Sequence, residues 1–352
     1  MNDMDYGYVN ARVKGMHSRL LDKKSYDALL IRQDLPSVIS ELVKTPYKTE
    51  IEEASILYSG ICVVDCALRK NLINTYQTIL GLVENTAAEL YLRIFLSRWD
   101  VQNIKTILRG KNIQTPTEDI FECLVPAGSL DEATLTELMK QPDVRAVIDL
   151  LATWEVPYAL PLTGAVDEYS SNRELVILEY ALDQFHYQNA LEKASGKTVE
   201  AEIIRNLIRV EIDTINIKSI LRIIRDRIEP EDAAKLFLEG GMHIRREKFE
   251  SLAPMRTIEE AVRALEGTPY YFLSELPPAV ITLGKISVFE KELDQYQIRN
   301  GVRLFRGDPL SLSVIIGYLW AKFCEVINLR IIARCKYAGV SDEDLEKELI
   351  HV

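Results

Sequence analysis

Apolar residues recur at helical spacing along most of this chain. They return every three or four positions with charged residues between them, which predicts amphipathic helices. The long helices are expected over residues 55–80, 87–108, 172–192, 199–228, 284–305 and 310–337, and shorter ones over 8–21, 131–139, 143–152, 231–238 and 257–265. Alternating runs flanked by tight-turn dipeptides are nearly absent, so we predict an all-α fold with little or no sheet.

One decamer occurs three times in the chain. It reads DVQNIKTILR at 100–109, DTINIKSILR at 213–222 and EVINLRIIAR at 325–334. The asparagines of the three copies stand 113 and 112 residues apart. Near-even spacing of one motif indicates an internal repeat.

Other markers keep the same step. A Pro-Tyr pair occurs at Pro46–Tyr47, Pro157–Tyr158 and Pro269–Tyr270. A weaker marker, KGMHSRL at 14–20, returns as GGMHIRR at 240–246 and less clearly as PAGSL at 126–130. Two independent markers repeated in one order indicate that the chain is a triplicated helical unit.

The length of the repeat predicts its architecture. A step of about 112 residues far exceeds the roughly 33–47 residues of helical solenoid repeats, so each copy is large enough for its own core. We therefore predict three similar helical bundles, residues 1–113, 114–226 and 227–352, in a pseudo-threefold, funnel-like arrangement.

The acidic residue and the asparagine of each decamer share one edge of the helix. A buried polar side chain of this kind usually bonds backbone in a neighbouring helix or loop, so we expect these residues to act as a repeat scaffold, with ligand contact as the alternative. The six scaffold residues are Asp100, Asn103, Asp213, Asn216, Glu325 and Asn328.

Each decamer also carries two cations one helical turn apart, on the other side of the wheel. These are Lys105, Arg109, Lys218, Arg222, Arg330 and Arg334. Like charges at this spacing repel, so acids from outside the turn are required. One interpretation is ion pairing with carboxylates elsewhere in the same bundle, worth about 0–1 kcal/mol per pair. The other is that the cations face a common concavity that receives an acidic segment of a partner.

Composition indicates a soluble, cytoplasmic protein. The chain has 42 basic and 53 acidic residues, and its net charge of -11 argues against general nucleic-acid binding. No stretch reaches the roughly 18 uninterrupted apolar residues that span a bilayer, and the opening MNDMDYGYVN does not resemble a secretory signal. The five cysteines form no CxxC pair, and Cys62 and Cys66 are expected to be buried small hydrophobes.

No motif in the sequence demands an enzyme. GKT at 196–198 lacks the upstream glycine of a phosphate loop, since position 191 is Leu191, and it follows a predicted helix, so we expect a turn between two helices. The four histidines are scattered without an HExxH motif, which argues against a zinc or di-iron site. We expect no catalytic residue, cofactor or metal.

The opening helix and the repeats together resemble one known family. The segment DYGYVNARVKGMHSRLL, with Tyr8, Arg12, Leu20 and Leu21, and the three decamers resemble the C subunits of the A/V-type rotary ATPases (ATP synthases) and the similar d subunits of vacuolar ATPases. The resemblance covers essentially the whole chain. The third copy departs mildly, with Glu325, Leu329 and Arg330 in place of Asp, Ile and Lys, which weakens strict threefold equivalence.

The resemblance implies a non-catalytic, funnel-shaped socket that passes torque between the central stalk and the membrane proteolipid ring. The implied partners are central-stalk subunits of the D and F types and the ring, and a contact with the membrane stator subunit is also compatible. The implied location is the cytoplasmic face of the cell membrane, as a peripheral part of an ion-transporting complex. The six decamer cations are the candidate stalk interface. Tyr47, Tyr158 and Tyr270 either pack at helix starts or face the ring.

Two other functions remain open at this point. A free-standing helical adaptor could bind acidic partner segments in its concavity. An all-helical enzyme with a dispersed site would show a deep pocket with converging ionisable groups.

Overall fold

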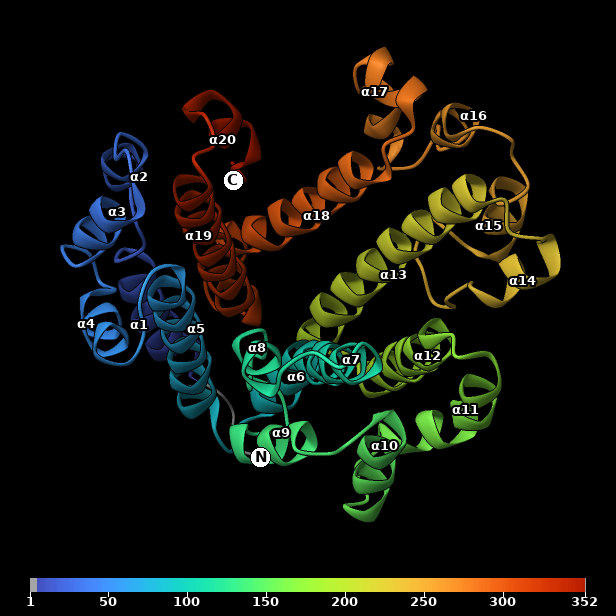
Figure 1. The fold of residues 1–352 in the computed structure, drawn as a ribbon, viewed down its shortest axis with the longest axis horizontal. Coiled ribbons are helices and arrows are strands. Elements are labelled where there is room, and N and C mark those ends of the chain that lie inside the picture. Colours follow the sequence, from blue (N-terminus) through green and yellow to red (C-terminus); the bar gives the residue numbers. More distant parts are fainter. Residues whose placement is uncertain (1–4, 352) are drawn as a thin grey trace. The chain divides into compact units, whose positions relative to one another are not determined.

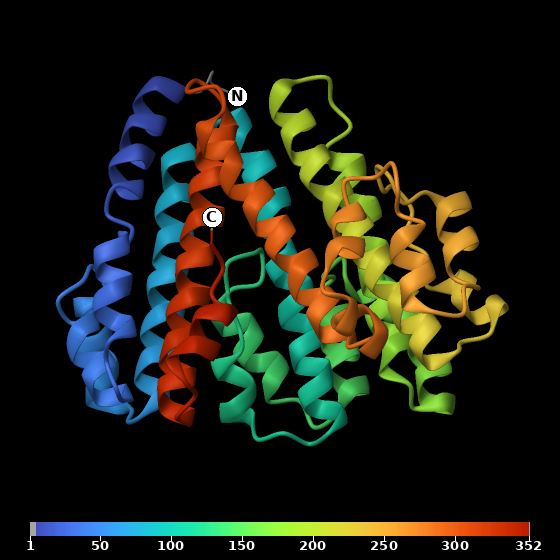
Figure 2. The same cartoon turned by 90° about the horizontal axis from the view of Figure 1, so that it is seen from above.

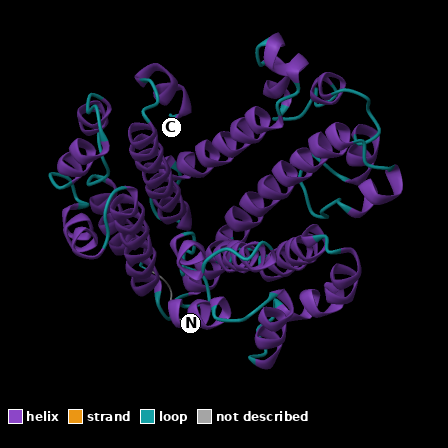
Figure 3. Cartoon of the chain, viewed as in Figure 1, coloured by secondary structure: helices purple, strands orange, loops and turns teal. Residues whose placement is uncertain are grey.

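Helices form all the regular secondary structure of residues 5–351, the part of the chain that the computed structural model describes (Figure 3). No strand occurs within that part. The predicted all-α fold is therefore confirmed, whereas the pseudo-threefold arrangement stays a prediction. The first four residues of the segment that was compared with a secretory signal lie outside the described residues, as does the C-terminal residue of the predicted third bundle.

The chain divides into two compact units. Unit 1 comprises residues 1–141 and 300–352, and unit 2 comprises residues 142–299. These divisions do not coincide with the predicted boundaries after residues 113 and 226, and the bundles 1–113, 114–226 and 227–352 stay a prediction.

Unit 1 joins the two ends of the chain. Its helices are α1 (Tyr6–His17), α2 (Lys23–Leu30), α3 (Leu35–Leu42), α4 (Lys48–Leu57), α5 (Ile61–Val83), α6 (Ala87–Leu96), α7 (Arg98–Asn112), α8 (Thr117–Glu122), α9 (Glu132–Met139), η2 (Leu304–Arg306), α19 (Leu312–Ala338) and α20 (Asp342–Glu348). Figures 1 and 2 both show α19 from the C-terminal part lying beside α5 from the N-terminal part, and α1 packs on α19 as well.

Helix α19 is the centre of unit 1. It is long and apolar enough to cross a membrane by length and composition, but 89% of its most apolar window is buried inside the protein. Its apolar residues therefore already have packing partners, as expected for a core helix.

Unit 2 contains α10 (Val144–Thr153), α11 (Ala159–Asn172), α12 (Leu175–Lys193), α13 (Val199–Asp226), α14 (Pro230–Lys235), α15 (Arg246–Leu252), α16 (Ile258–Arg263), η1 (Tyr271–Glu275), α17 (Pro278–Leu283) and most of α18 (Ile286–Arg303), whose last turn belongs to unit 1. Its core gathers around fully buried Phe249, Tyr270 and Phe289 against the C-terminal half of α13. The GKT segment forms the predicted turn, here between α12 and α13.

Local sequence signals explain where these helices begin. Asp22, Asp34, Asp131 and Asp143 each precede a helix, and each side chain accepts the backbone N–H three residues on. This capping satisfies one of the first N–H groups, which have no partner within the helix. The predicted helix 55–80 is interrupted, because Gly60 turns the chain with φ of +62° between α4 and α5.

Candidate functional site

The three decamer asparagines make the same contact. Each clamps the backbone of the residue 22 positions later, through its amide nitrogen and its amide oxygen. The pairs are Asn103 with Val125 (2.7 and 2.8 Å), Asn216 with Leu238 (2.8 and 2.9 Å) and Asn328 with Ile350 (2.9 and 2.8 Å). All three asparagines are buried, so each clamp removes two backbone groups from water without leaving them unpaired.

The two decamer aspartates bind the loop that follows each clamp. Asp100 accepts the amides of Ser129 and Leu130 at 2.9 Å, and Asp213 accepts those of His243 and Ile244 at 2.9 Å. Burial raises the pKa of both carboxyls, and these hydrogen bonds oppose that shift.

Glycine lets the two loops approach these carboxylates. A Cβ atom at Gly128 would overlap the carboxylate of Asp100, and one at Gly241 would overlap that of Asp213. The weak marker shared by PAGSL and GGMHIRR is therefore the loop that each aspartate holds. The asparagine and the aspartate of these two copies thus both bond backbone, and the role of the six residues as a repeat scaffold stays a prediction.

The third acid, Glu325, sits in a charged cluster with Lys322 and Tyr47. Its carboxylate accepts the Leu21 amide at 2.5 Å and the Tyr47 hydroxyl at 2.6 Å, and Lys322 Nζ lies 2.9 Å from it. Lys322 also reaches the Tyr47 hydroxyl at 2.8 Å. This cluster ties α19 to the N-terminal helices of unit 1, and burial lowers the pKa of Lys322.

The Pro-Tyr tyrosines are buried. Tyr47 and Tyr270 are 0% exposed and Tyr158 is 6% exposed. A side chain covered by its own chain has no surface to offer a partner, so the interpretation that these tyrosines face a proteolipid ring is wrong. They pack inside the protein.

The decamer cations of the second and third copies pair with carboxylates of the same unit. Lys218 lies 2.6 Å from Asp294, and Arg222 lies 2.5 Å from Glu290, so α13 pairs with α18. In unit 1 one carboxylate serves two cations: Asp65 of α5 is 2.9 Å from Arg330 and 3.0 Å from Arg334. Lys105 and Arg109 lie on α7, with Arg109 exposed. The acids come from outside the decamer, as the like-charge spacing requires.

A comparison with known proteins gives the family. Residues 9–348 match the family described as ATP synthase (C/AC39) subunit. The chain belongs to this family. It is 31% identical to the C subunit of the A-type ATP synthase of Methanosarcina mazei over 98% of its own length and 93% of that relative. The protein of the same name from Archaeoglobus fulgidus is 29% identical over 99% of this chain and 97% of the relative, and that of Methanocaldococcus jannaschii is 27% identical over 98% and 86%.

Membership in this family means that the chain is a subunit of an ATP synthase complex. The match covers all three decamers and most of the clamped backbone.

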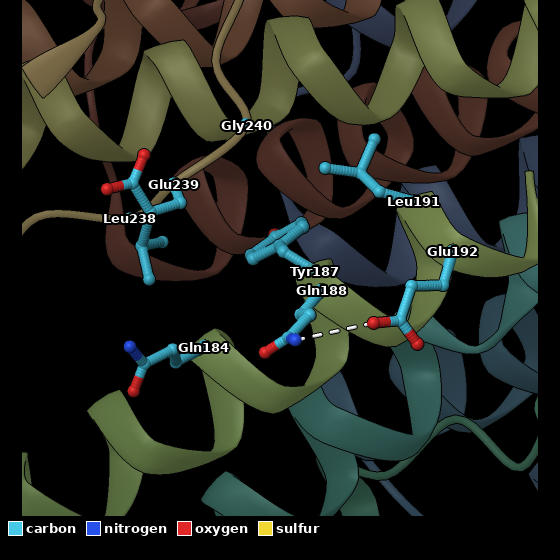
Figure 4. Close-up of a pocket in the computed structure, with 8 residues that line it drawn as sticks. All are labelled: Gln184, Tyr187, Gln188, Leu191, Glu192, Leu238, Glu239 and Gly240. Carbon is cyan, nitrogen blue, oxygen red and sulfur yellow. Dashed lines mark hydrogen bonds between the residues drawn. The ribbon is translucent and has the colours of Figure 1, made fainter. Parts of the chain in front are cut away.

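One pocket of unit 2 lies between α12 and the loop that Asn216 clamps (Figure 4). This open pocket of about 340 Å³ is lined by α12, through residues such as Tyr187, Leu191 and Glu192, and by the loop from Leu238 to Gly240 that the Asn216 clamp holds. Gln188 donates to Glu192 at 3.3 Å along one wall. The lining combines side-chain amides, carboxylates, the Tyr187 ring and apolar carbons.

Two parts of the scaffold were not anticipated from the C/AC39 sequence. The clamped residues Val125, Leu238 and Ile350 share no residue type, because only their backbone is used. Lys322 is missed since a single lysine in an apolar run gives no sign of its buried carboxylate partner. The regular spacing of the asparagines was the available signal for the clamps.

Proposed function

We propose that this chain is the non-catalytic central-stalk socket of an A/V-type ATP synthase. In this role it links the central-stalk subunits of the D and F types to the membrane proteolipid ring and passes torque between them. A further contact with the membrane stator subunit is compatible with this placement. The chain itself then needs no active site or cofactor.

Family membership over nearly the whole chain carries the proposal, and the internal scaffold supports it. A torque coupler must resist twisting between its helices and loops. The clamp of Asn216 on Leu238 and the contacts of Asp213 with the following loop fix one helix to one loop at several buried points. Buried, fully paired polar groups are costly to break, which favours a stiff structure.

We place the stalk interface at the decamer cations: Lys105, Arg109, Lys218, Arg222, Arg330 and Arg334. The pairs in the isolated chain do not exclude this role. Arg222 keeps 55% of its side-chain surface exposed, and its partner Glu290 keeps 26%. A solvent-accessible ion pair contributes little, so a partner carboxylate can replace Glu290 at small cost. The Asp65 carboxylate shared by Arg330 and Arg334 is only 9% exposed, so a partner that contacts these arginines must leave their pairing with Asp65 in place.

The proposed location is the cytoplasmic face of the membrane, as a peripheral subunit. Helix α19 is the strongest candidate span in residues 5–351, and its apolar side chains are packed inside unit 1. Its burial favours attachment through partner subunits over insertion into lipid.

Affinity purification of the tagged chain from native membranes tests this proposal. We expect nucleotide-binding head subunits, stalk subunits and a proteolipid to co-purify in fixed ratio. A soluble chain with none of these partners contradicts the proposal and favours the free-standing adaptor. Turnover of a substrate by the isolated chain contradicts the non-catalytic role.

A pair of matched variants tests the stalk interface. Lys218→Gln with Arg222→Gln removes the cations of α13, whereas Asp294→Asn with Glu290→Gln removes only their internal partners. Both variants break the same ion pairs within the chain. If the cations bind a stalk carboxylate, the first variant weakens stalk binding about tenfold and the second retains or tightens it. Equal effects of the two variants overturn the assignment.

A further inference from the structure

A second pocket in unit 2 lies where α13 ends. Its volume is about 450 Å³, and its walls are the last turn of α13, the turn into α14 and the α15–α16 connection. Ile223, Ile224, Ile228 and Met255 give it an apolar floor. That size is typical of sites that hold a small ligand or a few side chains.

Two arginines belong to the lining of this pocket. Arg227 and Arg256 both line the pocket and are exposed. Within residues 5–351 neither guanidinium forms an ion pair. The backbone N–H of Arg256 donates a hydrogen bond to the Glu260 carboxylate at 3.2 Å, which leaves its side chain uninvolved. The neighbouring Arg225 differs, because Asp226 holds its guanidinium with two hydrogen bonds of 2.6 and 2.7 Å. Both guanidinium groups therefore remain open to a carboxylate from outside the chain.

The repeat scaffold does not require these cations. Arg227 is the left-handed residue that ends its decamer helix, with φ of +53°, and the other two copies use Gln114 and Gly339 there, with φ of +57° and +68°. Arg256 precedes the helix cap Thr257, and the other copies place Gln33 and Pro142 before their caps Asp34 and Asp143. The left-handed conformation also disfavours a branched or bulky side chain in general, so backbone needs do not explain an arginine.

We infer that this pocket binds an acidic segment of a partner protein, with an apolar side chain on the floor and carboxylates on Arg227 and Arg256. Guanidinium groups match carboxylates with two parallel hydrogen bonds, which are stronger than neutral ones. Met255 suits such a floor because its flexible thioether adapts to different side chains. The partner is taken to be another subunit of the complex, so the inference rests on the proposed function.

Photo-crosslinking in the purified, assembled complex tests the inference. Met255 is replaced by p-benzoylphenylalanine, the complex is irradiated, and the crosslinked peptide is identified by mass spectrometry. We expect a crosslink to an apolar residue of another subunit that has Asp or Glu within a few positions. A lipid adduct, a basic peptide or no adduct overturns the inference. Failure of the chain to co-purify with the complex contradicts the proposed function instead, so the two failures are distinguishable.

Charge substitutions make the test specific. In the crosslinking background, Arg227→Gln with Arg256→Gln is expected to lower the crosslink yield about tenfold, since both carboxylate contacts are lost. Arg225→Gln is the matched control: it removes a cation from the same helix end, but one already paired with Asp226. A yield that falls equally in both variants, or in neither, overturns the role of the two arginines. Both substitutions replace exposed side chains, and the melting temperature of each variant shows whether the fold is retained.

Discussion

The Tyr270 hydroxyl donates to the Asp213 carboxylate at 3.1 Å, across 57 residues of chain. The Tyr47 hydroxyl bonds Glu325 in the same way at 2.6 Å, although these residues lie near opposite ends of the chain. Each of these two tyrosines therefore donates a hydrogen bond to the acidic residue of the preceding decamer. The first copy has no preceding decamer, so its Tyr47 bonds Glu325 of the last decamer instead, and this contact joins the N-terminal and C-terminal parts of the chain.

Removing the Tyr270 hydroxyl tests this relationship. Tyr270→Phe keeps the buried ring but deprives the buried Asp213 of one donor, so we expect a loss of about 1–3 kcal/mol in the free energy of unfolding. Chemical denaturation measures it. Tyr271→Phe at the neighbouring, 38% exposed position is the control and should change little. A loss as small as that of the control contradicts a structural role for the hydroxyl.

The asparagine clamp predicts a larger effect. Asn216→Ala leaves both the N–H and the C=O of Leu238 buried without their partner, and each such group costs about 1–3 kcal/mol. We expect destabilisation of more than about 2 kcal/mol in urea melts, with faster amide hydrogen exchange at Leu238.

Asn206→Ala, at an exposed position of the same helix, separates loss of the clamp from loss of an asparagine. Both variants replace asparagine by a better helix former, so helix propensity alone predicts a slight gain for each. A similar change in the two proteins would show that the clamp contributes nothing.

Helix periodicity was sufficient to predict the all-α fold and most of the long helices. The predicted helices 131–139 and 143–152 match α9 and α10 closely. Helix α15 was missed because only Phe249 and Leu252 are apolar among its seven residues, which is too few to establish a period, and α3 opens with Leu35–Pro36, where a proline suggests a break. The break at Gly60 was missed for a related reason, since one glycine within an apolar pattern does not reveal its φ angle.

The site was only partly readable from the sequence. The regular spacing of Asn103, Asn216 and Asn328 identified three equivalent side chains, and polar residues on a buried edge pointed to backbone contacts. Their partners could not be deduced, because a clamp on backbone selects no residue type. Ion pairs such as that of Arg330 with Asp65 were also beyond the sequence, since acids on any helical surface are candidates until the packing of α19 on α5 is known.

Acid is expected to destabilise unit 1 through His17. Burial lowers the pKa of His17, which stacks on Phe305 with ring centres 3.9 Å apart, and the nearby Glu325 opposes that shift. The unfolded chain thus takes up a proton at higher pH than the folded chain. The stability due to neutral His17 is fully present above about pH 6.5, the ordinary pKa of histidine, and is lost as the pH falls toward the folded pKa.

The difference between the wild type and His17→Phe isolates this effect. Phenylalanine keeps a stacked ring without a titrating group. In urea melts, the free energy of unfolding of the wild type minus that of His17→Phe should be constant above about pH 7. Below about pH 6.5 this difference should fall, by at most about 1.4 kcal/mol per pH unit. A difference that does not vary between about pH 5 and pH 8 contradicts the prediction.

The buried cluster of Lys322, Glu325 and Tyr47 predicts strong coupling between two substitutions. Lys322 and Glu325 are 6% and 5% exposed, so neutralising one leaves the other charge buried without its counter-ion. Glu325→Gln and Lys322→Met should each cost about 3–5 kcal/mol in the free energy of unfolding. The double variant, which buries no net charge, should cost less than either single one, and denaturation of all four proteins gives the coupling energy.

The exposed pair of Arg263 and Glu259, 2.7 Å apart on α16, is the control cycle. Arg263→Met and Glu259→Gln should show almost no coupling, because water screens both charges. Additive losses at Lys322 and Glu325 would mean that water reaches the cluster and that its charges are not held as a pair.

The same double variant also tests function, because Glu325 bonds the Leu21 amide and Tyr47 as well as Lys322. If the cluster stiffens the chain, the variant should reduce the coupling of ATP hydrolysis to ion transport more than it reduces ATP hydrolysis or ion transport measured separately. Equal losses in coupled and uncoupled hydrolysis would count against a role of this cluster in stiffness.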